Sequence, residues 1–153
     1  MKFSTRRDIN LAAEGLFRAA TNFHAIERLL VRRGATVRRL DKLAAPGVGM
    51  RWLIGFDWRG RERELTVELT QLDAPEVAVL QGRSEQFDLT IRMTVVALTR
   101  EKSRLIFETE AHPRGMKARL LLQTAKLGKA QLDRKFAQRI GQVVDQLAAR
   151  EIG

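Results

Sequence analysis

FSTRRDINLAAEGLFRAATNFHAIERLL, the stretch from Phe3 to Leu30, carries the first and most informative part of the fold. It opens with an extended segment over Lys2–Asp8, in which apolar and polar side chains alternate. Asn10 stands where a helix N-cap belongs, and apolar residues at helical spacing follow it. Thr21-Asn22 interrupts that pattern, and residues 23–30 then repeat apolar side chains every three or four positions. The stretch predicts one strand followed by two short helices.

The apolar period changes to two between Ala35 and Pro113, which predicts six half-buried antiparallel strands. The clearest alternation lies in Met50–Trp58. A two-residue turn at Arg59-Gly60 would place Ile54 opposite Leu65, so that apolar side chains meet on one face. A slip of one residue would set the same side chains against glutamates, and this hairpin register is therefore well specified.

The next hairpin is predicted to turn at Ser84-Glu85, which places Leu80 opposite Leu89. With the preceding hairpin, this pairing gives the sheet one continuous apolar face that is rich in aromatic side chains. We expect this face to be the inner one.

Two registers compete for the last hairpin. A four-residue loop would bring Glu108 and Glu110 to the inner face, where two unpaired carboxylates would be very costly. A register one residue different places Phe107 opposite Val95 and sets Glu110 beside Arg92 on the outside. The second register is the favoured one.

Residues 115–150 return to a helical period without any proline, which predicts one long helix. Its inner stripe consists of Ala118, Leu122, Ala125, Lys129, Leu132, Phe136, Ile140, Val143 and Leu147. Lys129 occupies an apolar position in this stripe. Its stem could snorkel to solvent, or the buried face could shift locally near Gly128. The functional alternative is that its ammonium lies at a cavity wall and faces an anionic ligand group. The order of elements predicts an α+β fold.

Length and composition narrow the class of protein. The 153 residues fit one domain over 1–153, and 44% hydrophobic with 30% charged residues is a globular composition. The chain has no Cys, which excludes disulfides and thiolate metal sites. No apolar run reaches the roughly 18 residues of a membrane span, and a secretory core is missing at the start, so we expect a cytoplasmic protein.

The net charge of +10 is concentrated in residues 1–40 and 114–153, while residues 41–113 are nearly neutral. An anionic partner or a bias in composition would each explain this distribution.

This order of elements resembles the START-like helix-grip superfamily, which includes the polyketide cyclase/dehydrase-like (SRPBCC) proteins. The resemblance rests on Phe3–Leu30, the strand at Val37–Asp41, the hairpins of Gly49–Pro113 and the terminal helix. It implies a curved antiparallel sheet of about seven strands that wraps the long C-terminal helix, with a largely apolar cavity between them. The superfamily includes lipid carriers, cyclases and quinone-binding proteins, so the fold alone does not define a function.

We expect ligand-binding residues on the aromatic sheet face and on the facing helix stripe. These are Trp52, Ile54, Phe56, Trp58, Arg63, Leu65, Val67, Leu89, Ile91, Met93, Lys129, Leu132 and Phe136. Arg61 and Arg63 would stand at the cavity mouth. We predict no catalytic residues, metal or cofactor, because the two His are far apart and phosphate-binding and nucleophile-elbow motifs are missing.

The preferred hypothesis is binding or transport of a hydrophobic small molecule or lipid. An acidic head group on this ligand would match the basic candidate residues Arg63 and Lys129. The alternative is a module that docks on RNA, an acidic protein or a membrane through a patch formed by Lys117, Lys126, Arg134, Arg139 and early Arg residues. A cyclase/dehydratase-type enzyme comes third and requires two polar groups that converge in the cavity. A monomer and a homodimer are both compatible with the sequence.

Overall fold

The computed structural model describes residues 1–152. Its elements, in chain order, are β1 (Lys2–Ile9), α1 (Ala13–Ala20), α2 (Phe23–Arg32), β2 (Thr36–Arg39), β3 (Arg51–Trp58), β4 (Arg61–Asp73), β5 (Val77–Arg83), β6 (Phe87–Ala97), β7 (Ser103–Pro113), α3 (Met116–Lys126) and α4 (Lys129–Ile152). The strands form one antiparallel sheet in the order β1-β7-β6-β5-β4-β3-β2. This arrangement confirms the predicted α+β class.

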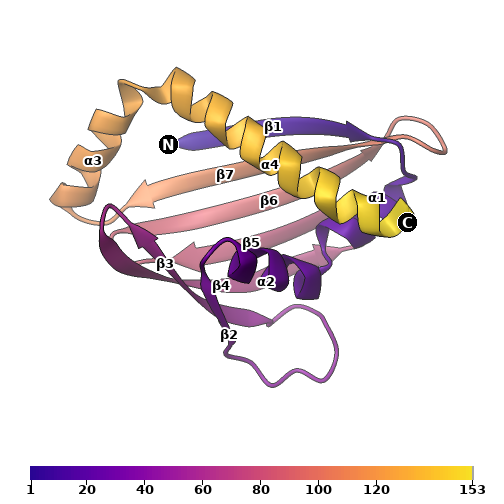
Figure 1. Cartoon of the computed structure of the whole chain (residues 1–153), viewed down its shortest axis with the longest axis horizontal. Helices are drawn as coiled ribbons and strands as arrows, with labels where there is room; N and C mark the ends of the chain where they lie inside the picture. The colour runs from indigo at the N-terminus through magenta and orange to yellow at the C-terminus, as the bar shows by residue number, and fades with distance from the viewer. Residues whose placement is uncertain (153) are drawn as a thin grey trace.

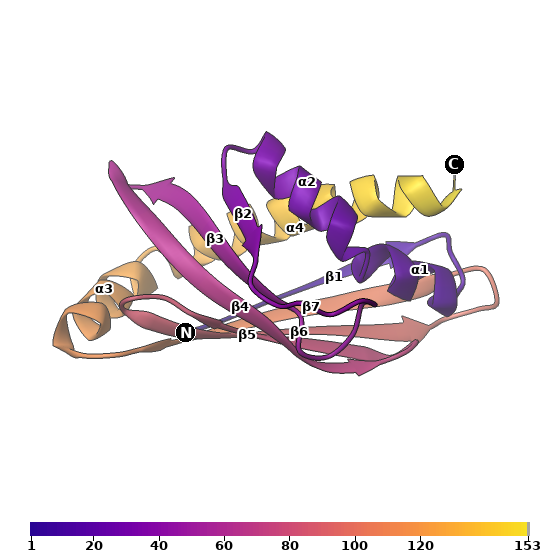
Figure 2. The ribbon, with the colours of Figure 1, turned by 90° about the horizontal axis from the view of Figure 1, so that it is seen from below.

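The sheet curves, and the helices α1, α2 and α4 lie on its concave side (Figures 1 and 2). α4 runs across the sheet from the end where the chain starts to the end where α1 lies (Figure 1). It packs against β1 and against α1. The expected grip of a curved sheet on the C-terminal helix is confirmed.

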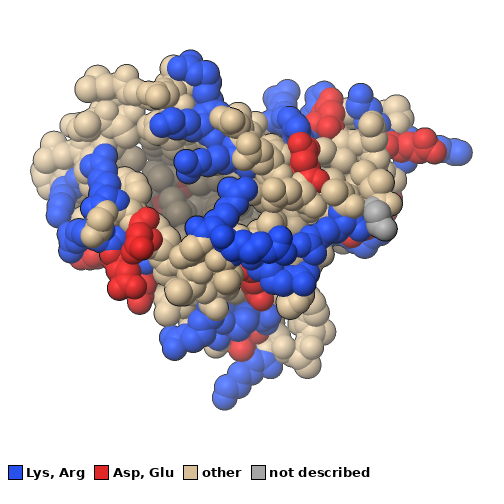
Figure 3. All heavy atoms as spheres, viewed as in Figure 1, with Lys and Arg blue, Asp and Glu red and all other residues tan. Residues whose placement is uncertain are grey.

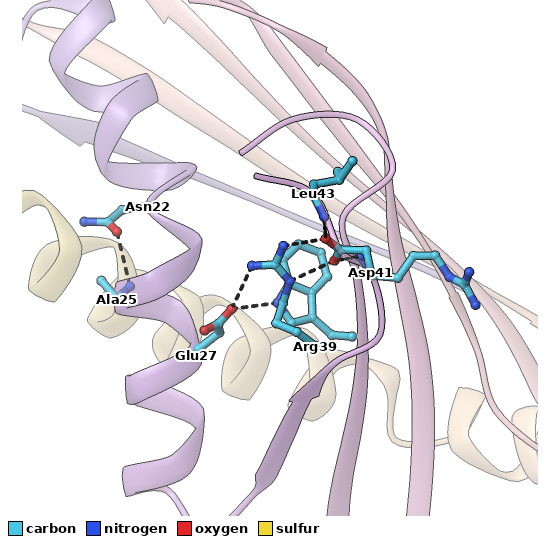
Figure 4. A network of polar contacts seen from close by, with 8 residues as sticks. Asn22, Ala25, Glu27, Arg39, Asp41 and Leu43 are labelled. Carbon is cyan, nitrogen blue, oxygen red and sulfur yellow. Dashed lines mark hydrogen bonds and ion pairs between the residues drawn. The ribbon is translucent and has the colours of Figure 1, made fainter. Parts of the chain in front are cut away.

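The two short helices follow β1 as predicted, but their starts differ in chemistry. Asn10 does not cap α1, because that helix begins two residues later with Ala12 at the N-cap and has no side-chain cap. Asn22 caps α2 instead, and its side-chain oxygen accepts a hydrogen bond from the amide of Ala25 (3.2 Å; Figure 4). Gly34 follows the α2 C-cap with a φ of +97°, a conformation that glycine adopts readily.

The predicted long helix is divided into α3 and α4 at Leu127-Gly128. Glycine weakens a helix interior because it has the largest backbone entropy to lose. The break lets α3 turn away from α4 at the end of the sheet, where it follows directly on β7 (Figure 1). The expectation of one continuous helix over 115–150 was therefore wrong.

The β3–β4 register is confirmed, with Ile54 opposite Leu65. The β5–β6 register was wrong by two residues, because Leu80 lies opposite Ile91 and not opposite Leu89. The amide of Ser84 donates to the carbonyl of Phe87 (2.9 Å), so the turn is centred on Glu85-Gln86, one residue further along the chain than predicted. A shift of two keeps every side chain on its predicted face.

Both registers considered for the last hairpin were wrong. Phe107 lies opposite Met93, and Glu108, not Glu110, lies opposite Arg92. The amides of Leu98 and Thr99 both donate to one carbonyl, that of Lys102, which sets the turn. The favoured choice of face was nevertheless right, since Phe107 points inward with the apolar set and the glutamates alternate outward.

The fully buried core occupies only one end of the interior. It lies where α1, α2 and the C-terminal half of α4 cover the sheet, and it includes Leu16, Phe17, Trp52, Leu69, Leu105, Val144 and Ala148. Toward α3, the inward-facing side chains are only half-buried. The interior is therefore filled at one end and incompletely covered at the other.

Candidate ligand-binding site

The molecule is hollowed on the face seen in Figure 1, between α3, the start of α4 and the β3–β4 hairpin (Figure 3). Leu89 and Ile91 of β6 and Phe107 of β7 face inward at this end of the sheet and are half-buried. Lys and Arg side chains are prominent around the hollow (Figure 3). The hollow therefore combines an apolar floor with a basic rim.

A cleft of about 450 Å³ lies beside the hollow, between the β3–β4 hairpin and the β5–β6 turn. It exists because β4 pairs with β5 only from Thr66 onward, where Thr66 lies opposite Arg83. The hairpin tip thus projects beyond the rest of the sheet (Figure 2). The cleft is lined by Phe56, Trp58, Glu62, Arg63, Glu64, Thr66, Arg83, Ser84, Glu85, Gln86 and Phe87.

Arg63 is the most distinctive polar residue of this region. It lies opposite Phe56, and its guanidinium carbon is 5.3 Å from the centre of the Trp58 ring, a cation–π contact. Its Nε is buried and has no hydrogen-bond partner within residues 1–152, and no carboxylate of that range pairs with it. A buried donor without an acceptor is unfavourable, so an anionic acceptor placed here would be stabilised.

Lys129 begins α4 beside the hollow, but its charge is already compensated. Its Nζ lies 3.0 Å from both carboxylate oxygens of Asp133, one turn along the same helix. The ammonium also lies 5.1 Å from the centre of the Phe3 ring. Phe136, one turn further, contacts Phe3 and Phe107 with ring centres 5.5 and 5.8 Å apart. Lys129 thus belongs to an aromatic wall and is less available than Arg63 to an anionic ligand.

The structure divides the remaining candidates by burial. Trp52, Val67 and Met93 lie in the filled core. Ile54, Leu65, Leu89, Ile91 and Phe136 are half-buried around the hollow. Phe56, Trp58 and Leu132 are exposed at the rim.

Two residues outside the predicted set also shape the site. Phe107 extends the apolar floor, and its inward position already followed from the favoured register of the last hairpin. Arg114 holds the β5–β6 turn, because it donates to the carboxylate of Asp88 (2.7 Å) and to the carbonyl of Ser84. No pattern in the sequence indicates this role of Arg114, because Asp88 and Ser84 are 26 and 30 residues away in the chain.

The clearest pKa shifts lie at surface ion pairs and not in the hollow. The Arg39 guanidinium, with backbone amides, holds the pKa of the Asp41 carboxyl well below its usual range (Figure 4). The Arg104 guanidinium lowers the pKa of Asp8 in the same way. These pairs join β2 to its following loop and β1 to β7.

The inward positions of the seven strands carry no Asp, Glu or His among the described residues. The strands therefore bring no pair of Asp, Glu or His side chains together on this face. Residues 1–152 also contain no cluster of three or more metal-ligating side chains. What the hollow offers is apolar surface with a guanidinium at its edge.

No protein-family model matches the sequence, and no curated protein matches it. Solved structures do share its architecture. The Zhui aromatase/cyclase from a Streptomyces species superimposes with a TM-score of 0.71 at 12% identity, over 100% of this chain and 96% of that one. Norcoclaurine synthase from Thalictrum flavum, in complex with dopamine and hydroxybenzaldehyde, superimposes with a TM-score of 0.67 at 11% identity, over 98% of this chain and 87% of that one.

A START superfamily protein from Mycobacterium smegmatis gives a TM-score of 0.62 at 11% identity, over 93% of this chain and 98% of that one. At such identities the likeness shows the fold. The chain has the START-like helix-grip fold, as the order of its elements implied. Within residues 1–152, no helix has the length and apolar character needed to span a bilayer.

Proposed function

We propose that the protein binds a hydrophobic small molecule or lipid in the hollow between the sheet and the α3–α4 corner. The observation that carries this proposal is the incomplete burial of Leu89, Ile91 and Phe107 on the inner sheet face. Apolar side chains that are left uncovered together in a concave region are typical of ligand sites. The relatives by fold support it, since they include a cyclase and a synthase that holds two aromatic compounds.

The binding residues fall into three groups under this proposal. The floor consists of Ile54, Leu65, Leu89 and Ile91, with Trp52, Val67 and Met93 packed deeper in the core. The wall consists of Lys129, Leu132 and Phe136 on α4. The rim consists of Phe56, Trp58 and Arg63 on the β3–β4 hairpin.

An acidic group on the ligand would bind at Arg63. The unpartnered Nε is the support for this choice, because a carboxylate or sulfonate oxygen would satisfy it and would pair with the guanidinium. Trp58 adds an exposed aromatic surface next to the same guanidinium. The ligand class is therefore an apolar molecule that carries one anionic group.

The test uses native mass spectrometry of the gently purified chain, followed by titration with the fluorescent probe anilinonaphthalene sulfonate. This probe combines aromatic rings with one sulfonate. We expect an apolar ligand that co-purifies with the chain, or saturable binding of the probe that fatty acids inhibit by competition. A chain that carries no ligand and shows no saturable probe binding would contradict the proposal.

Two variants locate the site. Ile91→Trp fills the floor and should abolish probe binding. Arg63→Gln should weaken the probe about tenfold or more, because a hydrogen bond to a charged group is worth about 1.5–3 kcal/mol. Arg61→Gln, two residues away and exposed, is the matched control and should change the affinity less than about twofold. Equal losses in the two arginine variants would exclude a specific role of Arg63.

A further inference from the structure

α3 is a short helix that packs by one face only. Ala118 is its one fully buried residue, while Leu121, Leu122 and Ala125 are half-buried. In the ribbon it stands clear of the sheet at one end of the molecule and is joined to α4 by a two-residue break (Figures 1 and 2).

The opposite face of α3 presents a second apolar stripe to solvent. Met116 is 69% exposed, Leu120 is 56% exposed and Leu127, just beyond the helix, is 91% exposed. At about 100° of rotation per residue, these three side chains project within about 40° of one another. They lie on the side of the helix that faces away from Ala118. No described residue covers them.

Basic side chains border this exposed stripe on both sides. Lys117 lies on one side, and Arg119 and Lys126 lie on the other, and all three are exposed. The sequence contains no Asp or Glu between Glu110 and Asp133. The stripe is therefore apolar along its centre and positively charged along both edges.

We propose that α3 docks the protein on the surface of an anionic phospholipid bilayer. Helices that lie in the membrane interface combine an apolar face, which enters the headgroup–acyl boundary, with Lys and Arg that pair with anionic headgroups. The positive charge along the edges of the stripe favours a negatively charged partner. The exposed Leu and Met select a bilayer over RNA, because phosphate contacts use basic side chains and gain nothing from an aliphatic stripe.

The position of α3 agrees with this role. Its end of the molecule is also the end at which the tip of the β3–β4 hairpin projects (Figures 1 and 2). The tip carries the exposed side chains of Trp58 and Arg59, which contact each other with the guanidinium carbon 4.7 Å from the ring centre. Trp is favoured at the membrane–water interface. The docking surface does not depend on which ligand the hollow takes.

The test is flotation of the full chain with large vesicles of phosphatidylcholine, either pure or mixed with phosphatidylglycerol. We expect binding to the mixed vesicles only, and a decrease as salt is added. Leu120→Gln with Leu127→Gln should reduce binding about tenfold or more. Lys117→Gln with Lys126→Gln should reduce it about fivefold for each lysine.

Matched controls use exposed residues at the C-terminal end of α2 and its C-cap. Val31→Gln replaces an apolar side chain that is 55% exposed, and Arg32→Gln with Arg33→Gln removes two charges; both variants should bind vesicles as the parent does. All variants should retain the far-ultraviolet circular dichroism and the probe affinity of the parent, which separates docking from folding and from the ligand site.

Three results would overturn the proposal. The first is equal binding to neutral and anionic vesicles, or binding to neither. The second is a loss in the α2 controls as large as the loss in the α3 variants. The third is tight binding of an RNA oligonucleotide or an acidic protein that the lysine variants abolish and the leucine variants leave unchanged, since this would assign α3 to a polyanion and not to a bilayer.

Discussion

The hydrogen bond between Glu27 of α2 and Trp52 of β3 is expected to stabilise the attachment of that helix to the sheet. The indole Nε1–H donates to a Glu27 carboxylate oxygen at 2.8 Å. Arg39 lies 4.0 Å from the same Glu27 oxygen (Figure 4). The Trp52 side chain packs on Phe23 with ring centres 5.3 Å apart. We therefore expect Glu27→Ala to destabilise the fold without removing any core side chain.

The size of the stability loss in Glu27→Ala follows from the burial of the Trp52 N–H donor. Trp52 is only 4% exposed, so the variant leaves its N–H largely without an acceptor, and such a group costs about 1–3 kcal/mol. In a chain of this length, each kcal/mol lowers the melting temperature by about 2–4 °C. A loss near 2 kcal/mol therefore corresponds to a fall of about 4–8 °C. Glu27→Gln keeps an acceptor oxygen and should lose less than half of this amount.

A double-mutant cycle separates the hydrogen bond from other effects of the substitution. Trp52→Phe removes the donor, and Glu27→Ala made in that background should cost less than about 0.5 kcal/mol. The measurement is urea unfolding followed by circular dichroism, with thermal melting as a second readout. A Glu27→Ala cost that is the same in both backgrounds, or one too small to measure in the parent, would refute the reasoning.

Three further outcomes are expected. Leu69→Ala should cost about 2–5 kcal/mol in urea unfolding, whereas Leu132→Ala at the exposed rim should cost less than about 1 kcal/mol. Gly82→Val should destabilise by about 1–3 kcal/mol, since even a Cβ at this position meets two leucine side chains at 3.3 Å. The pKa of Asp41 is lower in the folded than in the unfolded chain, so its contribution is complete above the ordinary carboxyl range and is lost as the pH falls through and below it. Asp41→Asn should therefore reduce stability at neutral pH and weaken the loss of stability on acidification, as urea titrations at several pH values would measure.

The face of each strand could be predicted from the sequence, but not every pairing. Alternation has a period of two, so a register error of two residues, as between β5 and β6, leaves Leu80 and Leu89 on the inner face. Turn geometry determines the pairing itself. The turn at Lys102 depends on backbone hydrogen bonds that no side-chain pattern encodes. The order of elements along the chain and the inner face of the strands followed from the pattern, whereas the pairing of β1 with β7 and the β5–β6 and β6–β7 registers did not.

The candidate site was predictable only as a set of inward positions. Periodicity identified Ile91 and Lys129 as neighbours of the interior, but it could not show that the interior is filled at one end and hollow at the other. That difference arises from the break at Gly128, which moves α3 off the sheet. The Lys129–Asp133 pair lies at an ordinary helical spacing, so the sequence could have indicated it, but it was not among the predictions. The unpartnered Nε of Arg63 was not, because it depends on the full three-dimensional surroundings.

The pairing of β1 with β7 has a consequence for how the protein is made. Lys2 lies opposite Glu110, and Ile9 lies opposite Ser103. The first strand, β1, therefore cannot pair until the last strand, β7, has been synthesised. α1 likewise cannot complete its packing until α4, its main helical neighbour, has been synthesised. On the ribosome, the first twenty residues therefore emerge long before their partners exist. Contacts so distant in sequence favour slow folding that is completed only after β7 and α4 have been made, with the apolar side of α1 exposed to chaperones meanwhile.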